Sequence, residues 1–157
     1  LILVGDIMDG SGSAAHTGEL LTVLEQQEVE LVLIEGNHDK AALKKARAFV
    51  HSHGEEEFIF HHGHLGIAPP SVLLRHPDTG SRRILVTGHQ HPAVSIQDGA
   101  GLRLKLPVLV QQRYSAGLDH WILPAFSPWA AGGTYTSEHT RLATWACAST
   151  RVWPVPH

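Results

Sequence analysis

Four short motifs carry side chains that bind metal ions or transfer protons. In chain order they are Gly5-Asp6, Gly36-Asn37-His38-Asp39, His61-His62-Gly63-His64 and Gly88-His89-Gln90-His91. Carboxylate, amide and imidazole groups are ligands for divalent cations, and a His with a pKa of about 6.5 can exchange protons near neutral pH. The chain holds 13 His among 157 residues, an excess that calls for a chemical explanation.

Each motif also has a purely structural interpretation. Asp6 follows an apolar run, where an Asp commonly caps a helix or stabilises a turn. In the second motif, Asn37 offers a carbonyl ligand, His38 an imidazole, and Asp39 a carboxylate that could orient that imidazole; Gly and Asn also favour a simple turn. His89 and His91 share one face in extended backbone, although a solvated turn before Pro92 is the alternative.

The first half of the chain predicts strands alternating with helices. Residues 1–4 form an apolar run and Val29–Ile34 a second one, and each ends at a polar turn. Between and after them, Glu19–Gln27 and Ala41–Val50 have helical spacing or helix-forming residues. This alternation is typical of βαβ units. Because ligands bind beyond the carboxyl ends of such strands, we expect Asp6 and Asn37 to converge there.

The second half predicts short strands separated by Pro, Gly and Asp turns. The expected strands are Glu57–Phe60, Arg83–Thr87, Leu102–Val110 and His120–Leu123, with a final strand pair within Leu142–Val155. We therefore predict an α/β fold in which a layered β-sandwich of mixed sheets is flanked by helices. No linker long enough to divide the chain is present, so residues 1–157 are interpreted as a single domain.

Composition is typical of a soluble globular protein. The chain is 43% hydrophobic and 17% charged, and its longest apolar runs fall short of the roughly 20 residues of a membrane span. The first ten residues lack the features of a signal peptide, and the single Cys147 cannot form an internal disulfide. We expect a cytoplasmic protein with no membrane partner. A net charge of −3 does not by itself indicate a nucleic-acid partner.

Taken together and in this order, the four motifs resemble those of the calcineurin-like metallophosphoesterase superfamily, whose pattern runs D-x-H, GD, GNH(D/E), H, GHxH. The resemblance implies a four-layer fold and a centre of two divalent ions, with Mn²⁺ as first choice and Zn²⁺, Fe²⁺ or Ni²⁺ as alternatives. It implies that Asp6 bridges the ions, with the further ligands Asn37, His62, His89 and His91. His38 and Asp39 would be catalytic, with His38 beside the scissile phosphate. Choosing His62 over His61 and His64 follows the family's habit of placing the ligand before Gly63.

The sequence departs from the family pattern at the first motif. No D-x-H precedes Asp6, so one of the two ions would keep only Asp6 and His91 as ligands. We therefore expect that the first strand and motif of the family are missing through an N-terminal truncation. On this interpretation the chain as given binds metal weakly and turns over poorly.

The segments GHQHPAV, LRLKLPVLV and WILPAFSPWAAGG are similar to the ligase-associated DNA damage response phosphoesterases, relatives of SbcD-type nucleases. This resemblance implies a phosphodiesterase or nuclease in DNA repair, with DNA as substrate and DNA ligase or helicase partners. Two alternatives stay open: a small-nucleotide phosphodiesterase or phosphatase, and a catalytically impaired scaffold that binds a partner. The remaining His residues have no motif around them and are predicted at the surface: His16, His51, His53, His76, His120, His139 and His157.

Overall fold

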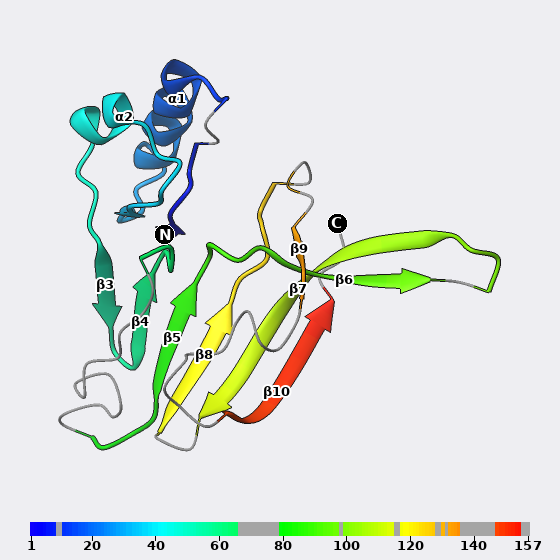
Figure 1. The fold of residues 1–157 in the computed structure, drawn as a ribbon. Coiled ribbons are helices and arrows are strands. Elements are labelled where there is room, and N and C mark those ends of the chain that lie inside the picture. The colour runs from blue at the N-terminus through cyan, green and yellow to red at the C-terminus, as the bar shows by residue number, and fades with distance from the viewer. Residues whose placement is uncertain are drawn as a thin grey trace.

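A computed structural model of the 157-residue chain gives the arrangement of its elements (Figure 1). It describes residues 1–8, 11–65, 79–97, 99–114, 117–127, 130, 132–135 and 147–154. Within these ranges the fold is α/β with mixed sheets and few helices, as predicted. The longest helix has 12 residues, and no helix in the described ranges is long and apolar enough to span a membrane.

The chain begins with the predicted βαβ unit. Strand β1 (Ile2–Val4) pairs in parallel with β2 (Val32–Ile34), and helix α1 (Ala14–Glu25) connects them. Helix α1 begins five residues earlier than the apolar spacing predicted, because the Ser13 hydroxyl accepts a hydrogen bond from the His16 N–H and caps the first turn. The carboxyl ends of both strands therefore lie at one edge, as expected.

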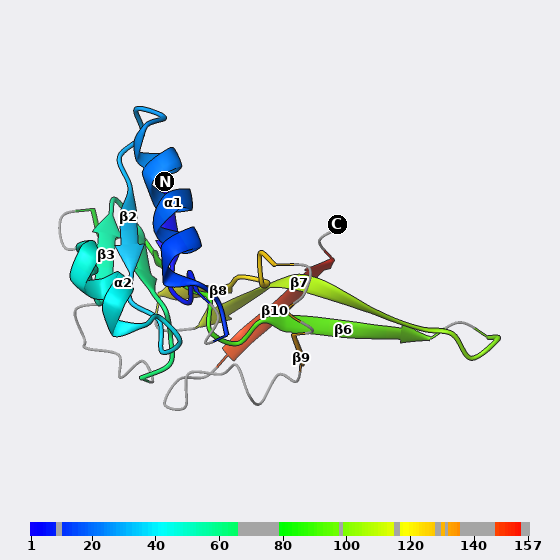
Figure 2. The same cartoon turned by 90° about the horizontal axis from the view of Figure 1, so that it is seen from above.

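Helix α2 (Ala41–Ala46) is shorter than predicted. At Arg47 the backbone becomes extended, and Val50 forms a parallel bridge with Ile34. Phe49 packs against the apolar cluster under α1, so burial of that ring and pairing of Val50 outweigh the helix propensity of residues 47–50. Figure 2 shows both helices beside β2 at one end of the molecule.

The second half forms one eight-stranded mixed sheet with the order β3-β4-β5-β8-β7-β6-β9, and β10 pairs along β7. Strands β4, β5 and β8 are parallel, and β3 and β7 pair antiparallel at their ends of this group. The strand bounds are β3 Ser52–Glu55, β4 Phe58–His61, β5 Arg83–Thr87, β6 Pro92–Gln97, β7 Arg103–Tyr114, β8 Leu118–Ile122, β9 Gly133–Thr134 and β10 Cys147–Pro154.

Several strands match their predicted positions, and others do not. Strand β5 has the predicted bounds, whereas β7 runs four residues further than Val110 because β8 and β10 flank its second half. Strands β3, β6 and β9 were not predicted. The expected final strand pair is represented by the single strand β10, and residues 142–146 lie outside the described part of the chain.

Two apolar clusters support these elements. Under the helices, Met8, Leu21, Leu33 and Leu43 are buried together. In the large sheet, Val108, Val110 and Ile122 form a second cluster. The first cluster belongs to the βαβ unit and the second to the large sheet, so each of these two parts of the fold has its own packed support.

His120 is buried in the large sheet, which corrects the prediction of a surface position. It is 1% exposed on β8, where Leu118 and Ile122 are buried on the same face. Strand alternation explains this placement, because residues i and i+2 share a face. Burial lowers the pKa of His120 from 6.5 to about 4, and no charged neighbour contributes to the shift. The ring is therefore neutral at pH 7.

This shift predicts a loss of stability in acid. Because the folded-state pKa lies below the unfolded value, neutral burial of His120 contributes fully above pH 6.5 and is lost as the pH falls toward 4. At 1.36 kcal/mol per pKa unit, the unfolding free energy lost over this pH range is of the order of 3 kcal/mol. We expect His120→Gln to reduce the difference in unfolding free energy between pH 7 and pH 4, measured by urea denaturation. His16→Gln, at an exposed position, is the control; equal pH dependence in all three proteins would contradict this account.

Candidate metal centre

Asp6 lies at the centre of the candidate site. It follows β1 directly, after Gly5, and its backbone has a positive φ of 50°. Its Oδ1 accepts a hydrogen bond of 2.9 Å from the His38 backbone N–H, and its Oδ2 lies 3.1 Å from His62 Nε2. The turn after β2 thus fixes one carboxylate oxygen and leaves the other directed at the His residues.

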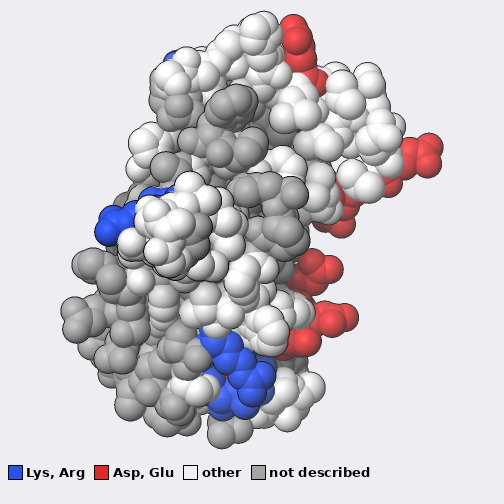
Figure 3. All heavy atoms as spheres, turned by 90° about the vertical axis from the view of Figure 1, so that its right-hand side faces the viewer, with Lys and Arg blue, Asp and Glu red and all other residues white. Residues whose placement is uncertain are grey.

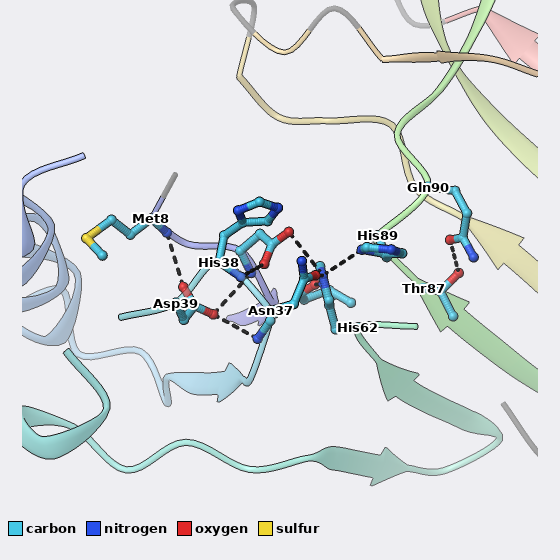
Figure 4. A network of polar contacts seen from close by, with 11 residues as sticks. Met8, Asn37, His38, Asp39, His62, Thr87, His89 and Gln90 are labelled. Atoms are coloured by element: carbon cyan, nitrogen blue, oxygen red, sulfur yellow. Dashed lines mark hydrogen bonds and ion pairs between the residues drawn. The ribbon is translucent and has the colours of Figure 1, made fainter. Parts of the chain in front are cut away.

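The buried carboxylate of Asp39 ties the turns after β1 and β2 together. Its Oδ2 accepts hydrogen bonds from the backbone N–H groups of Asp6 and Gly36, at 3.1 and 2.8 Å, and its Oδ1 accepts one from Met8 at 3.2 Å. Figure 4 shows the His38 imidazole projecting away from this carboxylate. Asp39 was expected to orient that imidazole. Its contacts indicate a different role, because it fixes the backbone of the two turns.

His62 is the buried His of its motif and has a defined tautomer. Its Nδ1 lies 2.9 Å from the carbonyl oxygen of Val4. Because a carbonyl only accepts, Nδ1 carries the proton, and the neutral ring has its lone pair on Nε2. This nitrogen faces Asp6 Oδ2 and Asn37 Oδ1, each at 3.1 Å. Three acceptor atoms thus converge.

His89 completes the group from the turn after β5, which pairs in parallel with β4. Its Nδ1 lies 3.2 Å from His62 Nε2, and Asp6, His62 and His89 each place one ligand atom within 4.8 Å of the others. Figure 4 shows Asn37, His62 and His89 in succession, with their polar ends directed at one another. A second proton on His62 would satisfy only the oxygen atoms of Asp6 and Asn37. A divalent cation would satisfy all four side chains: Asp6, Asn37, His62 and His89. The residues present therefore fit a cation with mixed oxygen and nitrogen ligands.

His91 does not belong to the group of ligand atoms that lie within 4.8 Å of one another. Its pKa is lowered by burial, while Asp6 raises it and His62 and His38 lower it further. Burial likewise lowers the pKa of His89, with His62 lowering it and Asp6 raising it. Asp6 thus acts on both His residues of the GHQH motif. His38 is exposed, and it is one of the groups that lower the pKa of His91.

Motif glycines permit the close approach of these turns. A Cβ at Gly36 would lie 2.1 Å from the Asp6 backbone nitrogen, and a Cβ at Gly5 would lie 2.3 Å from His62 Nδ1. At Gly88 it would lie 2.8 Å from the Val4 carbonyl oxygen. Real Cβ atoms do not approach other atoms so closely. Gly5, Gly36 and Gly88 are therefore each required by a close contact with a segment that is distant in sequence.

The structure distinguishes the three His residues of the HHGH motif. Only His62 joins the group of ligand atoms; in His61 and His64 the buried Nδ1 has no hydrogen-bond partner. The His64 ring lies 5.2 Å from that of His62, centroid to centroid. Burial, followed by repulsion from His64, His62 and His51, lowers the pKa of His61. A surface position was also predicted for His76, His139 and His157, which lie outside the described residues.

Sequence reasoning missed two polar groups behind the site. Thr87, the last residue of β5, is fully buried, and its hydroxyl contacts His120 Nε2 at 2.9 Å. The signal for His120 was available in the alternation of residues 118–122. Thr87 had no such signal, since a Thr at the end of an apolar strand is common.

Comparisons with protein-family models, with curated proteins and with solved structures found no match for the chain. The candidate site is therefore defined by its geometry and by the motifs in the sequence.

Replacing Gly36 by Ala tests the close approach of the two turns. The added methyl group displaces the Asp6 turn, and we expect Mn²⁺ affinity, measured by calorimetry, to fall about tenfold or more, with a loss of about 1–3 kcal/mol in unfolding free energy. Gly18→Ala is the matched control, because its Cβ on α1 meets nothing within 4 Å. Unchanged affinity in Gly36→Ala would show that the turns are not held as described.

Removing the converging ligand atoms should weaken cation binding strongly. We expect Asp6→Asn and His62→Ala each to weaken Mn²⁺ binding by at least 10- to 100-fold, the range found for groups that only support metal ligands. His61→Ala is the neighbouring control, because His61 lies outside the ligand group. A larger loss in His61→Ala than in His62→Ala would reverse the choice of ligand.

Proposed function

We propose that this protein is a metal-dependent phosphoesterase that hydrolyses phosphodiester bonds with a two-metal centre. The observation that carries the proposal is the convergence of Asp6, His62 and His89 from three separate strand ends, each placing a ligand atom within 4.8 Å of the others. These are three of the five residues that the motif order assigns as metal ligands. The α/β architecture with mixed sheets is compatible with the four-layer metallophosphoesterase fold, which is part of the proposal.

The proposed ligand sets share Asp6. Asn37, His62 and His89 would bind one ion with Asp6, and His91 would bind the other. The electrostatic influence of Asp6 on both His89 and His91 supports this division. The D-x-H motif, which the family uses to complete the second ion, has no counterpart ahead of Asp6 in the sequence. Mn²⁺ is the proposed metal, because mixed carboxylate, amide and imidazole ligands suit it.

When bound, the two ions would hold the phosphate and lower the pKa of an attacking water. Proton transfer and positioning would be carried out by side chains of the protein. His38, exposed at the site, would donate a proton to the leaving alkoxide. Asp39 would contribute indirectly, because its hydrogen bonds to Asp6 and Gly36 keep the turn that carries His38 against the site.

The proposed setting is cytoplasmic DNA repair, with DNA as substrate and a DNA ligase or helicase as partner. It is supported by the resemblance of segments 88–94 and 121–133 to the ligase-associated phosphoesterases. The exposed cations nearest the site in sequence are Lys40 and Lys45. These side chains are suited to contact a phosphate backbone.

A small-nucleotide substrate is the second candidate. On the face shown in Figure 3, the described Lys and Arg side chains form separate groups, and acidic side chains gather along one edge. Proteins that follow a nucleic-acid backbone generally present a continuous basic groove. A compact phosphodiester, for which the metal centre itself would supply most of the contacts, needs no such groove.

Hydrolysis of bis-p-nitrophenyl phosphate, a cyclic nucleotide and single-stranded DNA in the presence of Mn²⁺ tests the function. The assay uses the chain and, where the reading frame extends upstream of Leu1, the longer protein. We expect His38→Ala to lower kcat by about 10²- to 10⁴-fold while metal content stays at the wild-type level; His16→Ala is the control. Activity on nucleotides alone would reject the nuclease. Metal binding without hydrolysis of any substrate would indicate a binding scaffold.

A further inference from the structure

The loop that carries His89 and His91 is held from several directions. On one side, the His62 carbonyl oxygen accepts hydrogen bonds from the N–H groups of Gly88 and His89, at 3.2 and 3.0 Å. On the other, the His91 carbonyl oxygen accepts one from Gly133 at 2.9 Å. These contacts fix the backbone at both ends of the loop. Gln90, between the two proposed ligands, is held through its side chain.

The Gln90 side chain connects to a buried polar pair. Thr87 Oγ1 donates to Gln90 Oε1 at 3.3 Å and contacts His120 Nε2 at 2.9 Å. Thr87 and His120 are 0% and 1% exposed. Figure 4 shows Thr87 and Gln90 behind His89, on the side away from His62. A chain of contacts therefore runs from the interior of the large sheet to the middle of the GHQH motif.

The positions of the protons follow from the contacts. The Thr87 hydroxyl has one hydrogen, and the Gln90 oxygen can only accept it. His120 must then donate Nε2–H to Thr87, which leaves its buried Nδ1 as a bare lone pair without a partner. This neutral tautomer agrees with the lowered pKa of the ring. An unpaired acceptor is better tolerated in a protein interior than an unpaired donor, so the arrangement is consistent.

Stability of the sheet alone does not account for this pair. Neighbouring positions of β5 and β8 are filled by buried apolar residues: Leu85, Val86, Leu118 and Ile122. Replacing both partners of a buried hydrogen bond by apolar groups of similar shape is often nearly neutral for stability. An apolar pair at positions 87 and 120 would serve the sheet equally well. What such a pair would lack is the hydrogen bond to Gln90.

We propose that His120 and Thr87 are positioning residues, which hold Gln90 and thereby set the spacing of His89 and His91 around the cation pair. This inference rests on the proposed metal centre. Neither residue touches the cations or the substrate; both act through the Gln90 side chain. Groups that orient metal ligands typically change metal affinity by about 10- to 100-fold when they are removed.

Three variants test the relay by Mn²⁺ calorimetry, with unfolding measured separately in the absence of metal. We expect Thr87→Val to lower Mn²⁺ affinity by about 10- to 100-fold, and Thr87→Ser, which keeps the hydroxyl, to retain affinity within about twofold of wild type. The double variant Thr87→Val/His120→Leu leaves no buried donor unpaired. We expect it to keep the wild-type midpoint of unfolding and still to show the loss of affinity.

A double-mutant cycle separates positioning from a general loosening of the sheet. If Thr87 acts through Gln90, then Thr87→Val and Gln90→Leu lower Mn²⁺ affinity by similar factors, and their combination adds no further loss. Wild-type affinity in the stable double variant, or additive losses in the cycle, would overturn the inference while leaving the metal centre intact. Failure of the wild-type chain to bind Mn²⁺ would instead overturn the metal centre, and the relay with it.

Discussion

The arrangement of the site depends on one buried carboxylate. Asp39 accepts hydrogen bonds from three backbone N–H groups that belong to two turns, those of Asp6 and Met8 after β1 and that of Gly36 after β2. Unpaired N–H groups at the end of buried strands would be costly, and one side chain satisfies all three. Because the same contacts fix the backbone of Asp6, the position of the central carboxylate follows from the folding of the βαβ unit.

Electrostatics around Asp6 favour a cation. Burial lowers the pKa of His89 and His91, and the contact of His62 Nδ1 with the Val4 carbonyl directs Nε2 of that ring toward Asp6 and Asn37. Neutral imidazoles and a carboxylate present lone pairs without their own positive charge. A metal ion, as proposed for this site, would satisfy every one of these groups at once.

The two halves of the site come from different sheets. The βαβ unit supplies Asp6 and Asn37, and the large sheet supplies His62, His89 and His91. Glycines at the strand ends allow these turns to touch. Behind the GHQH loop, the contacts of Thr87, His120 and Gly133 extend the support into strands near the end of the chain. Residues of β8 and β9 thus support the proposed metal centre, together with the turns that carry its proposed ligands.

Local patterns in the sequence were sufficient to predict the βαβ unit and strand β5, and to place the motifs at strand ends. Apolar runs that end at Gly-Asp or Gly-Asn report burial and a strand end within a few residues, so no distant contact is needed to recognise them. The candidate ligand Asp6 belongs to this group, since its position after β1 follows from the run itself.

Long-range packing decided the rest. The resemblance named His62 as the ligand within HHGH, but the orientation of its ring depends on the Val4 carbonyl, 58 positions away in the chain. The role of Asp39 likewise depends on N–H groups of the β1 turn. Burial of His120 and early termination of α2 likewise depend on strands and side chains that only the folded chain brings near. Local sequence specifies which groups are available for chemistry, but hydrogen bonds between distant turns determine which of them meet.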